Sequence, residues 1–303
     1  DDSISGGAST TVLVRNLAPQ LRDLSAITIN EDGITRLTGT ILDPSPLDTF
    51  TLAVVWGDGA VESFGFEAGT SNFLVTHRYL DDDPTGSPFD NIPITVTLTD
   101  DDGATAGPDS TLVRVNNVAP AVVDLGLQIE VIPENGVATL IGRIDDVGTL
   151  DSFTLDIDWG DPRSRLNTET IELTSSSPHV TFDATTRIFT VTHQYLDDNP
   201  AAIPPDTYKI EVTATDDDRL SGSASTTVQV NNTPPVLEFD PVAAIDENGT
   251  ATVSGTVIDP GSLDTFTLNI DWGDPLSPDN IETFDLTTPP AHLMWDAATR
   301  RFT

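Results

Sequence analysis

The chain has 303 residues, with 49 Asp and Glu against 13 Lys and Arg, and its formal net charge is −36. So negative a field repels phosphate backbones and anionic lipid, which argues against nucleic-acid binding and membrane-surface docking. No apolar run approaches the roughly 18 residues that a membrane span needs, which argues against membrane insertion. Cysteine is absent, so disulfides, thiol catalysis and zinc–thiolate sites are excluded.

The first 16 residues match residues 217–232, which end the second copy of an internal repeat. We therefore expect residues 1–16 to be the last strand of a preceding repeat, so that the chain is a window on a longer tandem array. In an alternative interpretation this strand completes a repeat of another molecule, as in donor-strand exchange.

The repeat itself occurs three times, and we expect domains at residues 17–117, 118–232 and 233–303, the last one incomplete at its C-terminal side. Each copy opens on an Asn-x-x-Pro segment and continues with an acidic Asn/Gly turn and a strand that ends in Trp-Gly-Asp. The tryptophans of this last motif, Trp56, Trp159 and Trp272, are 103 and 113 residues apart. This spacing is typical of independent sandwiches of about 100 residues rather than of a solenoid.

Within each copy, apolar and polar residues alternate, which predicts half-buried strands of a two-sheet structure. The strand before Trp-Gly-Asp buries Phe50, Leu52, Val54 and Trp56 in the first copy, and its counterparts run from Phe153 to Trp159 and from Phe266 to Trp272. Further strands are expected at residues 207–214 and 251–257, and residues 169–189 alternate as an added hairpin. The fold class is therefore all-β, a linear array of immunoglobulin-like β-sandwiches with the tryptophans in their cores.

Several motifs in a fixed order carry a family resemblance. They are Asn-x-x-Pro, the Asp-containing turn, Trp56-Gly57-Asp58-Gly59, His77-Arg78-Tyr79 and the ending from Val96 to Gly103. In this order the chain resembles polycystic-kidney-disease-type (PKD) domains, with acidic clusters that are closer to cadherin-like calcium-bridged repeats. The resemblance implies extracellular or cell-surface adhesion and spacing roles, with no catalysis in the domain itself. Copies two and three depart from it by reading Trp-Gly-Asp-Pro.

The acidic residues recur at the same places in every copy. Sandwich topology places the second-to-third and sixth-to-seventh strand loops at the leading end, where Asn-x-x-Pro meets the first strand. The acidic Asn/Gly turn and the Tyr-Leu-Asp-Asp loop lie at the opposite, trailing end, so trailing acids of one repeat should meet leading acids of the next. Hard oxygen ligands on loops suit Ca²⁺ better than Mg²⁺. The predicted ligands are Glu31, Asp43, Asp48, Asp81, Asp82, Asp100, Asp102, Asn117, Glu134, Asp145, Asp146, Asp151, Asp197, Asp198, Asp216, Asp218, Asn232, Glu247, Asp259 and Asp264.

Two other interpretations of the acids stay open. They can form a solvated acidic surface suited to high salt, or, in pairs, a glycosidase site. Recurrence at fixed positions favours calcium over the first, and the absence of a Gly-x-Ser-x-Gly, His-Glu-x-x-His or phosphate-loop motif argues against an enzyme.

The function that these patterns favour is an extracellular structural or adhesive repeat protein, rigidified by calcium into a rod, surface layer or filament. The alternative is a carbohydrate- or protein-binding accessory region of a large secreted enzyme. Expected partners are further copies of the repeat, by head-to-tail self-association or in a longer array, and a cell-surface or polysaccharide partner.

Overall fold

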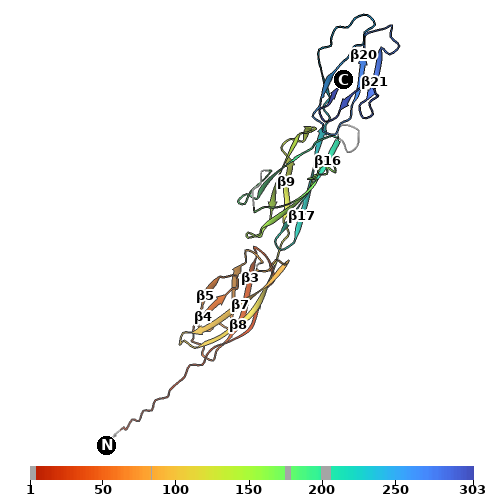
Figure 1. Cartoon of the computed structure of the whole chain (residues 1–303). Coiled ribbons are helices and arrows are strands. Elements are labelled where there is room, and N and C mark those ends of the chain that lie inside the picture. Colours follow the sequence, from red (N-terminus) through yellow and green to blue (C-terminus); the bar gives the residue numbers. More distant parts are fainter. Residues whose placement is uncertain (1–4, 83, 175–178, 199–205) are drawn as a thin grey trace. The chain divides into compact units, whose positions relative to one another are not determined.

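The computed structural model describes residues 5–82, 84–174, 179–198 and 206–303. Every regular element in these ranges is a β-strand, which confirms the all-β prediction (Figure 1). The chain divides into two compact units, each described by itself below. The first contains residues 1–120, 146–153 and 215–221, and the second contains residues 121–145, 154–214 and 222–303. Two acidic loops of the second repeat therefore belong to the same compact unit as the first repeat.

The first repeat folds as a sandwich of two sheets, one in the order β1-β3-β6 and the other in the order β2-β8-β7-β4-β5. Most neighbours in these sheets are antiparallel, and β2 pairs with β8 in parallel. Strands β4, β5, β7 and β8 lie side by side in Figure 1. The strands are β1 (Gln20–Ala26), β2 (Ile29–Asn30), β3 (Ile34–Leu42), β4 (Phe50–Val55), β5 (Val61–Phe66), β6 (Asn72–Arg78), β7 (Phe89–Asp100) and β8 (Thr105–Asn116).

Alternation along these strands builds the core between the two sheets. Phe50, Leu52 and Val54 of β4 are buried, while the residues between them face solvent, as the period of two predicts. Trp56 is fully buried. Its ring stacks on His77 with centroids 4.7 Å apart, and the Tyr79 hydroxyl donates to the Trp56 carbonyl over 2.7 Å. The predicted core position of this tryptophan is thus confirmed.

The second repeat has the same plan, with sheets in the orders β14-β15-β11-β9 and β10-β17-β16-β12-β13. Trp159 is again fully buried and stacks on His193 at 4.8 Å, and Tyr195 donates to the Trp159 carbonyl over 2.8 Å. The strands are β9 (Ala121–Leu127), β10 (Val131–Pro133), β11 (Val137–Asp145), β12 (Phe153–Asp158), β13 (Thr168–Glu172), β14 (Val180–Asp183), β15 (Ile188–Gln194), β16 (Asp206–Asp216) and β17 (Ser221–Asn231).

The added hairpin predicted over residues 169–189 is partly wrong. Its second half is a hairpin, because β14 pairs with β15 from Val180–Val191 to Asp183–Ile188. Its first half, β13, pairs instead with β12, as β5 pairs with β4 in the first repeat. Among the described strands of the second repeat, β14 alone is therefore an addition to the plan of the first repeat.

The third repeat forms a four-stranded sheet, β18-β19-β23-β22, and a two-stranded sheet, β20-β21. The strand predicted over residues 251–257 is shorter than expected, because β19 begins only at Gly255. It pairs with β23 at two positions, whereas the corresponding β11 of the second repeat pairs with β15 at seven. Trp272 is 37% exposed, so its predicted burial in the core is wrong. The strands are β18 (Val236–Phe239), β19 (Gly255–Ile258), β20 (Thr267–Asp271), β21 (Ile281–Asp285), β22 (Trp295–Asp296) and β23 (Arg301–Phe302).

Residues 5–19, which include most of the predicted strand at 1–16, have no regular structure, and residues 1–4 lie outside the described residues. Val12 and Val14 of this segment are 82% and 86% exposed, whereas the matching Val228 and Val230 of β17 are fully buried. The described residues contain no helix with the length and apolar character that crossing a bilayer requires.

Candidate metal centres

Two glutamates are positioned by the same tight turn in the first and second repeats. Asp32 and Asn135 have φ values of 57° and 58°, a left-handed conformation that Asp and Asn tolerate, and the glycine after each donates a turn hydrogen bond. The residue before each left-handed residue is a glutamate, Glu31 or Glu134. Both glutamates are buried, with exposed fractions of 3% and 1%.

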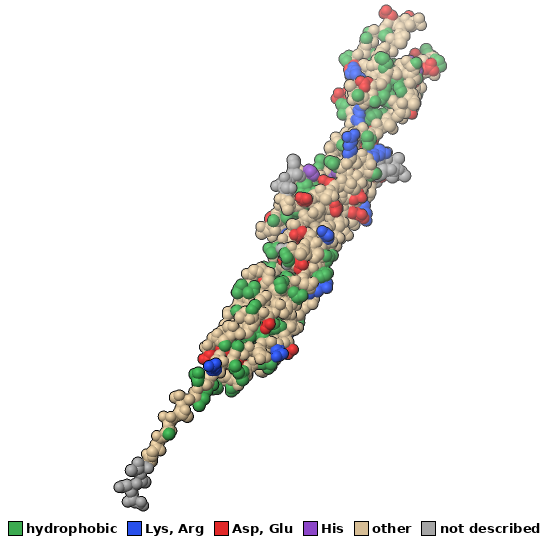
Figure 2. Space-filling view, turned by 60° about the horizontal axis from the view of Figure 1, so that its bottom comes forward, with side chains coloured by type: hydrophobic (Ala, Val, Ile, Leu, Met, Phe, Trp, Pro, Cys, Tyr) green, Lys and Arg blue, Asp and Glu red, His purple; other side chains and the backbone are tan. Residues whose placement is uncertain are grey.

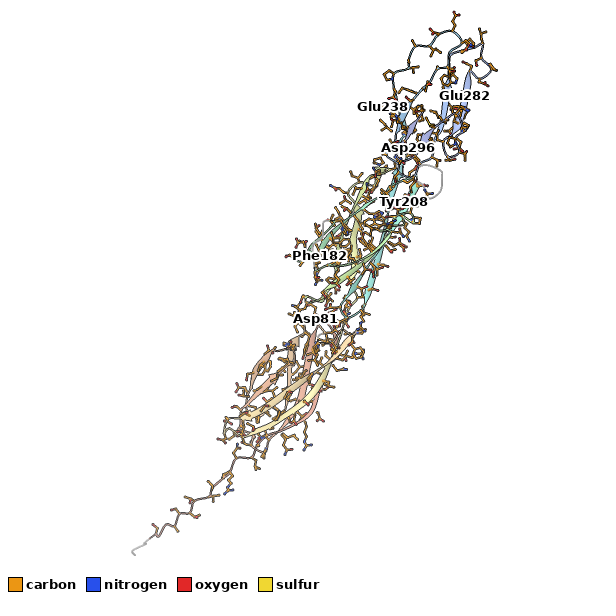
Figure 3. The ribbon with its side chains drawn as sticks, viewed as in Figure 1. Asp81, Phe182, Tyr208, Glu238, Glu282 and Asp296 are labelled. Carbon is orange, nitrogen blue, oxygen red and sulfur yellow. The ribbon has the colours of Figure 1, made fainter. Side chains whose placement is uncertain are left out.

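The first acidic cluster lies in the first unit and consists of Glu31, Asp81, Asp82, Asp151, Asp217 and Asp218. It comprises three overlapping groups, in each of which three carboxylate oxygens lie within 4.8 Å of one another. Glu31, Asp81 and Asp151 form one group, and Asp81, Asp82 and Asp218 form another. Asp151, Asp217 and Asp218 form the third. Asp81, labelled in Figure 3, lies in the loop after β6.

Several oxygens of this cluster are buried without a hydrogen-bond partner. They are Glu31 Oε2, both carboxylate oxygens of Asp82 and both of Asp151. Asp82 itself is fully buried, and its carboxylate can hydrogen-bond to that of Asp218 only when one of the two is protonated. Within the described residues, no ion pair of a Lys or Arg side chain reaches Glu31, Asp82 or Asp151. The cluster thus collects buried negative charge that the described side chains do not neutralise.

The electrostatics of the first cluster follow from this burial. Desolvation raises the pKa of Glu31 to about 7 and the pKa values of Asp82 and Asp151 to about 8, and repulsion from neighbouring carboxylates adds to each shift. The pKa of Asp218 is also raised, again mainly by burial. Near neutral pH these groups either keep protons or need a cation.

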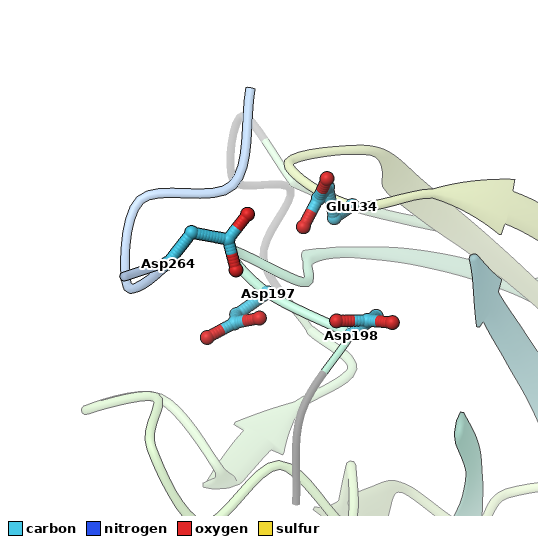
Figure 4. Close-up of side chains that lie close together, drawn as sticks. All are labelled: Glu134, Asp197, Asp198 and Asp264. Carbon is cyan, nitrogen blue, oxygen red and sulfur yellow. The ribbon is translucent and has the colours of Figure 1, made fainter. Parts of the chain in front are cut away.

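The second acidic cluster lies in the second unit and consists of Glu134, Asp197, Asp198 and Asp264, which form a single group (Figure 4). Glu134 Oε2, Asp197 Oδ1 and Asp198 Oδ2 are buried without a hydrogen-bond partner. Burial raises the pKa of Glu134 to about 7 and that of Asp264 to about 6, and it raises the pKa of Asp198 as well. A cation is already near one edge, where Arg163 donates to Asp197 Oδ2 over 3.1 Å.

The Asn-x-x-Pro segments hold both clusters in place. In the first, the N–H of Val118 donates to Glu31 Oε1 over 2.6 Å, and in the second the N–H of Thr233 donates to Glu134 Oε1 over 2.7 Å. The Asn117 amide donates to Asp216 Oδ2 over 2.9 Å, while its own Oδ1 is buried without a hydrogen-bond partner. Asn117 thus carries a buried amide oxygen next in sequence to Val118, whose N–H holds Glu31.

A third, smaller group of Asp43, Asp48 and Asp100 lies at the leading end of the first repeat. Asn16 donates to Asp100 Oδ2 over 2.7 Å, as Asn117 does to Asp216. Asp43 Oδ2 and Asp48 Oδ2 are buried without a partner. The predicted meeting of the two leading-end loops is thus found in this repeat.

A glycine lies against the acids of both larger clusters. A Cβ added at Gly148 would overlap carboxylate oxygens of Asp151 and Glu31, and a Cβ added at Gly261 would overlap those of Glu134 and Asp264. The first repeat has Ser45 at this position, and its hydroxyl donates to Asp48 Oδ1 over 2.5 Å. A side chain at Gly148 or Gly261 would therefore require these carboxylate groups to move.

Most predicted ligands are brought together, but some are not. Asp102, Asn232 and Glu247 are exposed and in no group, and the exposed Asp145 accepts a hydrogen bond from Arg143 over 2.9 Å. Asp216 accepts hydrogen bonds from Asn117 and from the N–H of Leu220, the latter over 2.8 Å, and it belongs to no group. Asp146 and Asp259 border the clusters and raise the pKa values of Glu31 and Glu134.

Asp217 is the cluster residue that the predicted ligand set omitted. It lies between two predicted ligands in an Asp-Asp-Asp run, and it accepts the N–H of Ser152 over 3.0 Å. The Asp-Asp-Asp run indicated that acids gather in this turn. The alternation of buried and exposed residues applies to strands and not to turns, so the sequence could not show which of the three side chains reaches the cluster.

The chain matches no protein-family model, and comparison with curated proteins returns no match. Solved structures with a similar fold include the PKD domain of an M14-like peptidase from the archaeon Thermoplasmatales SCGC AB-540-F20, at 19% identity and a TM-score of 0.29, over 34% of this chain and 100% of that one. A tetra-tandem repeat in the extending region of a large adhesion protein aligns at 13% identity and a TM-score of 0.35, over 88% of this chain and 65% of that one. Drosophila N-cadherin EC1-3 aligns at 15% identity and a TM-score of 0.24, over 71% of this chain and 68% of that one. At these TM-scores none of the three bears on what the chain does.

Proposed function

We propose that the chain is a structural or adhesive repeat protein of the cell exterior, in which Ca²⁺ bound at the acidic clusters fixes consecutive repeats to one another. The observation that carries the proposal is that buried carboxylates from two repeats converge in one group with unpartnered oxygens, as Glu31 and Asp151 do. A buried charge without a counter-charge costs several kcal/mol, roughly, so such a group needs either protons or a cation.

The donor set fits Ca²⁺. The ligand atoms are carboxylate oxygens, and they come from several loops rather than from one rigid element. Ca²⁺ takes 6–8 oxygens at roughly 2.3–2.6 Å in flexible geometries, whereas Mg²⁺ demands near-octahedral geometry and keeps its waters. The described donors contain no thiolate, and no histidine belongs to any group, which disfavours zinc and copper.

The mechanical consequence follows from the origin of the ligands. Glu31, Asp81 and Asp82 follow strands of the first repeat, and Asp151, Asp217 and Asp218 belong to loops of the second. Without a cation these side chains repel one another, and with it they share a ligand. Calcium would therefore stiffen the connection between repeats, which is the property that a rod, surface layer or filament requires.

A solvated acidic surface is the competing explanation for the charge. On the face shown in Figure 2, Asp and Glu side chains are scattered over the surface with Lys and Arg side chains among them. A surface suited to salt, however, needs exposed carboxylates, whereas Glu31, Asp82, Glu134, Asp197 and Asp198 are all more than nine-tenths buried. Burial at matching positions in two repeats supports ligand chemistry over solubility.

One feature, a cleft in the third repeat, supports the alternative that the chain is a carbohydrate- or protein-binding accessory region. Trp272 and His292 line a cleft of about 260 Å³ in the third repeat, together with Ile270, Phe284 and Phe302. The side chains that correspond to Ile270 in the other repeats, Val54 and Ile157, are buried in the core. The cleft is therefore the open side of a core rather than a surface built for sugar, and the calcium proposal is preferred.

Thermal unfolding tests the proposal. Calcium at 100 times its dissociation constant stabilises the folded state by about 2.7 kcal/mol. For a repeat of about 100 residues, this raises the Tm by about 10–20 °C. We expect a rise of that size between chelator and millimolar Ca²⁺ at pH 7.5, and a smaller rise with Mg²⁺. A Tm that responds to 1 M NaCl but not to Ca²⁺ would support the solvated acidic surface instead.

A further inference from the structure

The first cluster is divided in a way that the second is not. Glu31 and Asp82 belong to different groups, and Asp81 is the residue that the two groups share. Oxygens that bind one Ca²⁺ at roughly 2.3–2.6 Å lie at most about 5 Å apart. A single ion therefore accounts for the group of Glu31, Asp81 and Asp151, or for that of Asp81, Asp82 and Asp218, but no described group unites them.

The second cluster provides an internal comparison. Its four members correspond by position in the repeat to members of the first: Glu134 to Glu31, Asp197 to Asp81, Asp198 to Asp82 and Asp264 to Asp151. These four make one group in the second cluster, whereas their counterparts are split between two in the first. In the first cluster Asp82 groups instead with Asp81 and Asp218.

Each group of the first cluster has its own buried, unpartnered oxygens. In one group these are Glu31 Oε2 and both oxygens of Asp151, and in the other they are both oxygens of Asp82. Glu31 is 3% exposed and Asp82 is fully buried. Since one ion placed at Glu31 would leave the Asp82 carboxylate buried and unpaired, each group requires its own positive charge.

Charge balance agrees with this division. Glu31, Asp81, Asp82, Asp151 and Asp218 carry five negative charges when ionised, of which one divalent cation neutralises two and a pair neutralises four. The third group, with Asp151, Asp217 and Asp218, adds only the exposed Asp217, whose Oδ1 already accepts the N–H of Ser152. This third group therefore borders the two cation sites and does not form a third cation site.

We propose that the first acidic cluster binds two divalent cations bridged by the Asp81 carboxylate, whereas the second cluster binds one. The inference rests on the proposed function, since it specifies how many ions each junction takes. It also assigns distinct roles to equivalent residues, because Asp82 completes a second ion site while its counterpart Asp198 contributes to a single shared one.

Counting bound ions tests the proposal. A parent variant with Glu134→Gln, Asp264→Asn, Asp48→Asn and Asp100→Asn confines calcium to the first cluster, and circular dichroism checks that it folds. Native mass spectrometry in saturating Ca²⁺ should then show two ions on the parent and one after addition of Asp82→Asn. One ion on the parent would overturn the two-cation proposal while leaving the proposed function intact. Binding of no ion by the parent and by the intact chain alike would overturn the proposed function itself.

If the fourfold variant does not fold, the same ion count on the intact chain tests the proposal. There, Asp82→Asn is expected to remove one ion from the saturated complex. The matched Asp198→Asn is expected to remove none and only to raise the Ca²⁺ concentration needed for saturation. Equal counts for the wild type and Asp82→Asn would overturn the division of the first cluster.

Discussion

The N–H of Val118 donates to one carboxylate oxygen of Glu31 over 2.6 Å, while the other oxygen of Glu31 is buried without a hydrogen-bond partner. The same relationship links Thr233 to Glu134 over 2.7 Å. One side chain thus holds the backbone of the segment between repeats and presents an oxygen to an acidic group. A single carboxylate therefore couples cation binding to the position of the segment, and the described residues contain two such carboxylates.

This coupling makes Glu31 and Glu134 the most informative residues to change. Glu31→Gln keeps an oxygen for the Val118 hydrogen bond but removes the charge, so Ca²⁺ affinity at the first cluster should fall about tenfold or more, since affinity follows ligand charge. Glu134→Gln should do the same at the second cluster. Calorimetric titration of the decalcified chain measures both effects.

Glu247→Gln is the matched control, because Glu247 occupies the same turn position in the third repeat but is exposed. We expect it to leave the titration unchanged. Equal losses from all three substitutions would mean that bulk charge, and not position, governs the affinity.

The raised pKa values predict how the stability of the metal-free chain depends on pH. Glu31 and Glu134 have pKa values of about 7, and Asp82 and Asp151 of about 8, all above their ordinary values of 4.5 and 3.8. The folded chain therefore binds more protons than the unfolded chain between about pH 4 and pH 8, and its stability falls as pH rises through that window. The Tm of the decalcified chain should be higher at pH 5 than at pH 8.

Calcium should reverse this trend, because it binds the ionised carboxylates and displaces their protons. The difference in Tm between the loaded and the decalcified chain should therefore grow from pH 5 to pH 8. Removing calcium with a chelating resin avoids the weak affinity of soluble chelators in acid. A decalcified chain that gains stability from pH 5 to pH 8 would show that these carboxylates are not buried as described.

The glycines beside the clusters give a steric prediction. Gly148→Ala would drive a methyl group into the oxygens of Asp151 and Glu31, and Gly261→Ala would do so at Glu134 and Asp264. Overpacking of this kind costs roughly 1–3 kcal/mol, and a cost of that size at the ligand positions corresponds to a loss of about 5- to 150-fold in Ca²⁺ affinity. Titration of each variant measures the loss at its own cluster.

Gly126→Ala serves as the control, since a Cβ added there meets no heavy atom within 4 Å. It lies in β9 and should leave the affinity unchanged. Unaltered calcium binding by Gly148→Ala would mean that the loop rearranges without disturbing the carboxylates, contrary to the geometry described.

The core makes a separate prediction that does not involve metal. Tyr79→Phe and Tyr195→Phe each remove a buried hydrogen bond to the carbonyl of the core tryptophan, at 2.7 and 2.8 Å. Each should destabilise its repeat by roughly 1–3 kcal/mol, because the carbonyl is left unsatisfied. Tryptophan-fluorescence unfolding in urea should show a loss of similar size with and without Ca²⁺. A loss confined to the calcium-loaded chain would link these tyrosines to the clusters instead.

Much of this organisation could be predicted from the sequence, because it depends on short-range patterns. Alternation identified the buried face of β4 and β12, and repetition of acids at fixed positions predicted that Glu31 and Asp151 would converge. The meeting of Asp43 with Asp48 and Asp100 followed from sandwich topology, since it places both loops at one end.

The remainder depends on contacts that no local pattern contains. Trp272 has the same motif as Trp56, yet its exposure depends on which strands flank β20. The oxygens of Asp216 are used by Asn117 and Leu220, which only three-dimensional hydrogen bonding could show. The division of the first cluster between Glu31 and Asp82 depends likewise on distances between loops far apart in the chain.

The most direct measurement is anomalous diffraction from crystals of the chain grown with Ca²⁺. Calcium held as proposed gives anomalous peaks within roughly 2.3–2.6 Å of carboxylate oxygens, beside Glu31, Asp81 and Asp151 in the first cluster and beside Glu134 and Asp264 in the second. Carboxylates in the same places with no anomalous peak between them, at millimolar Ca²⁺ and pH 8, would contradict the proposal that calcium joins the repeats.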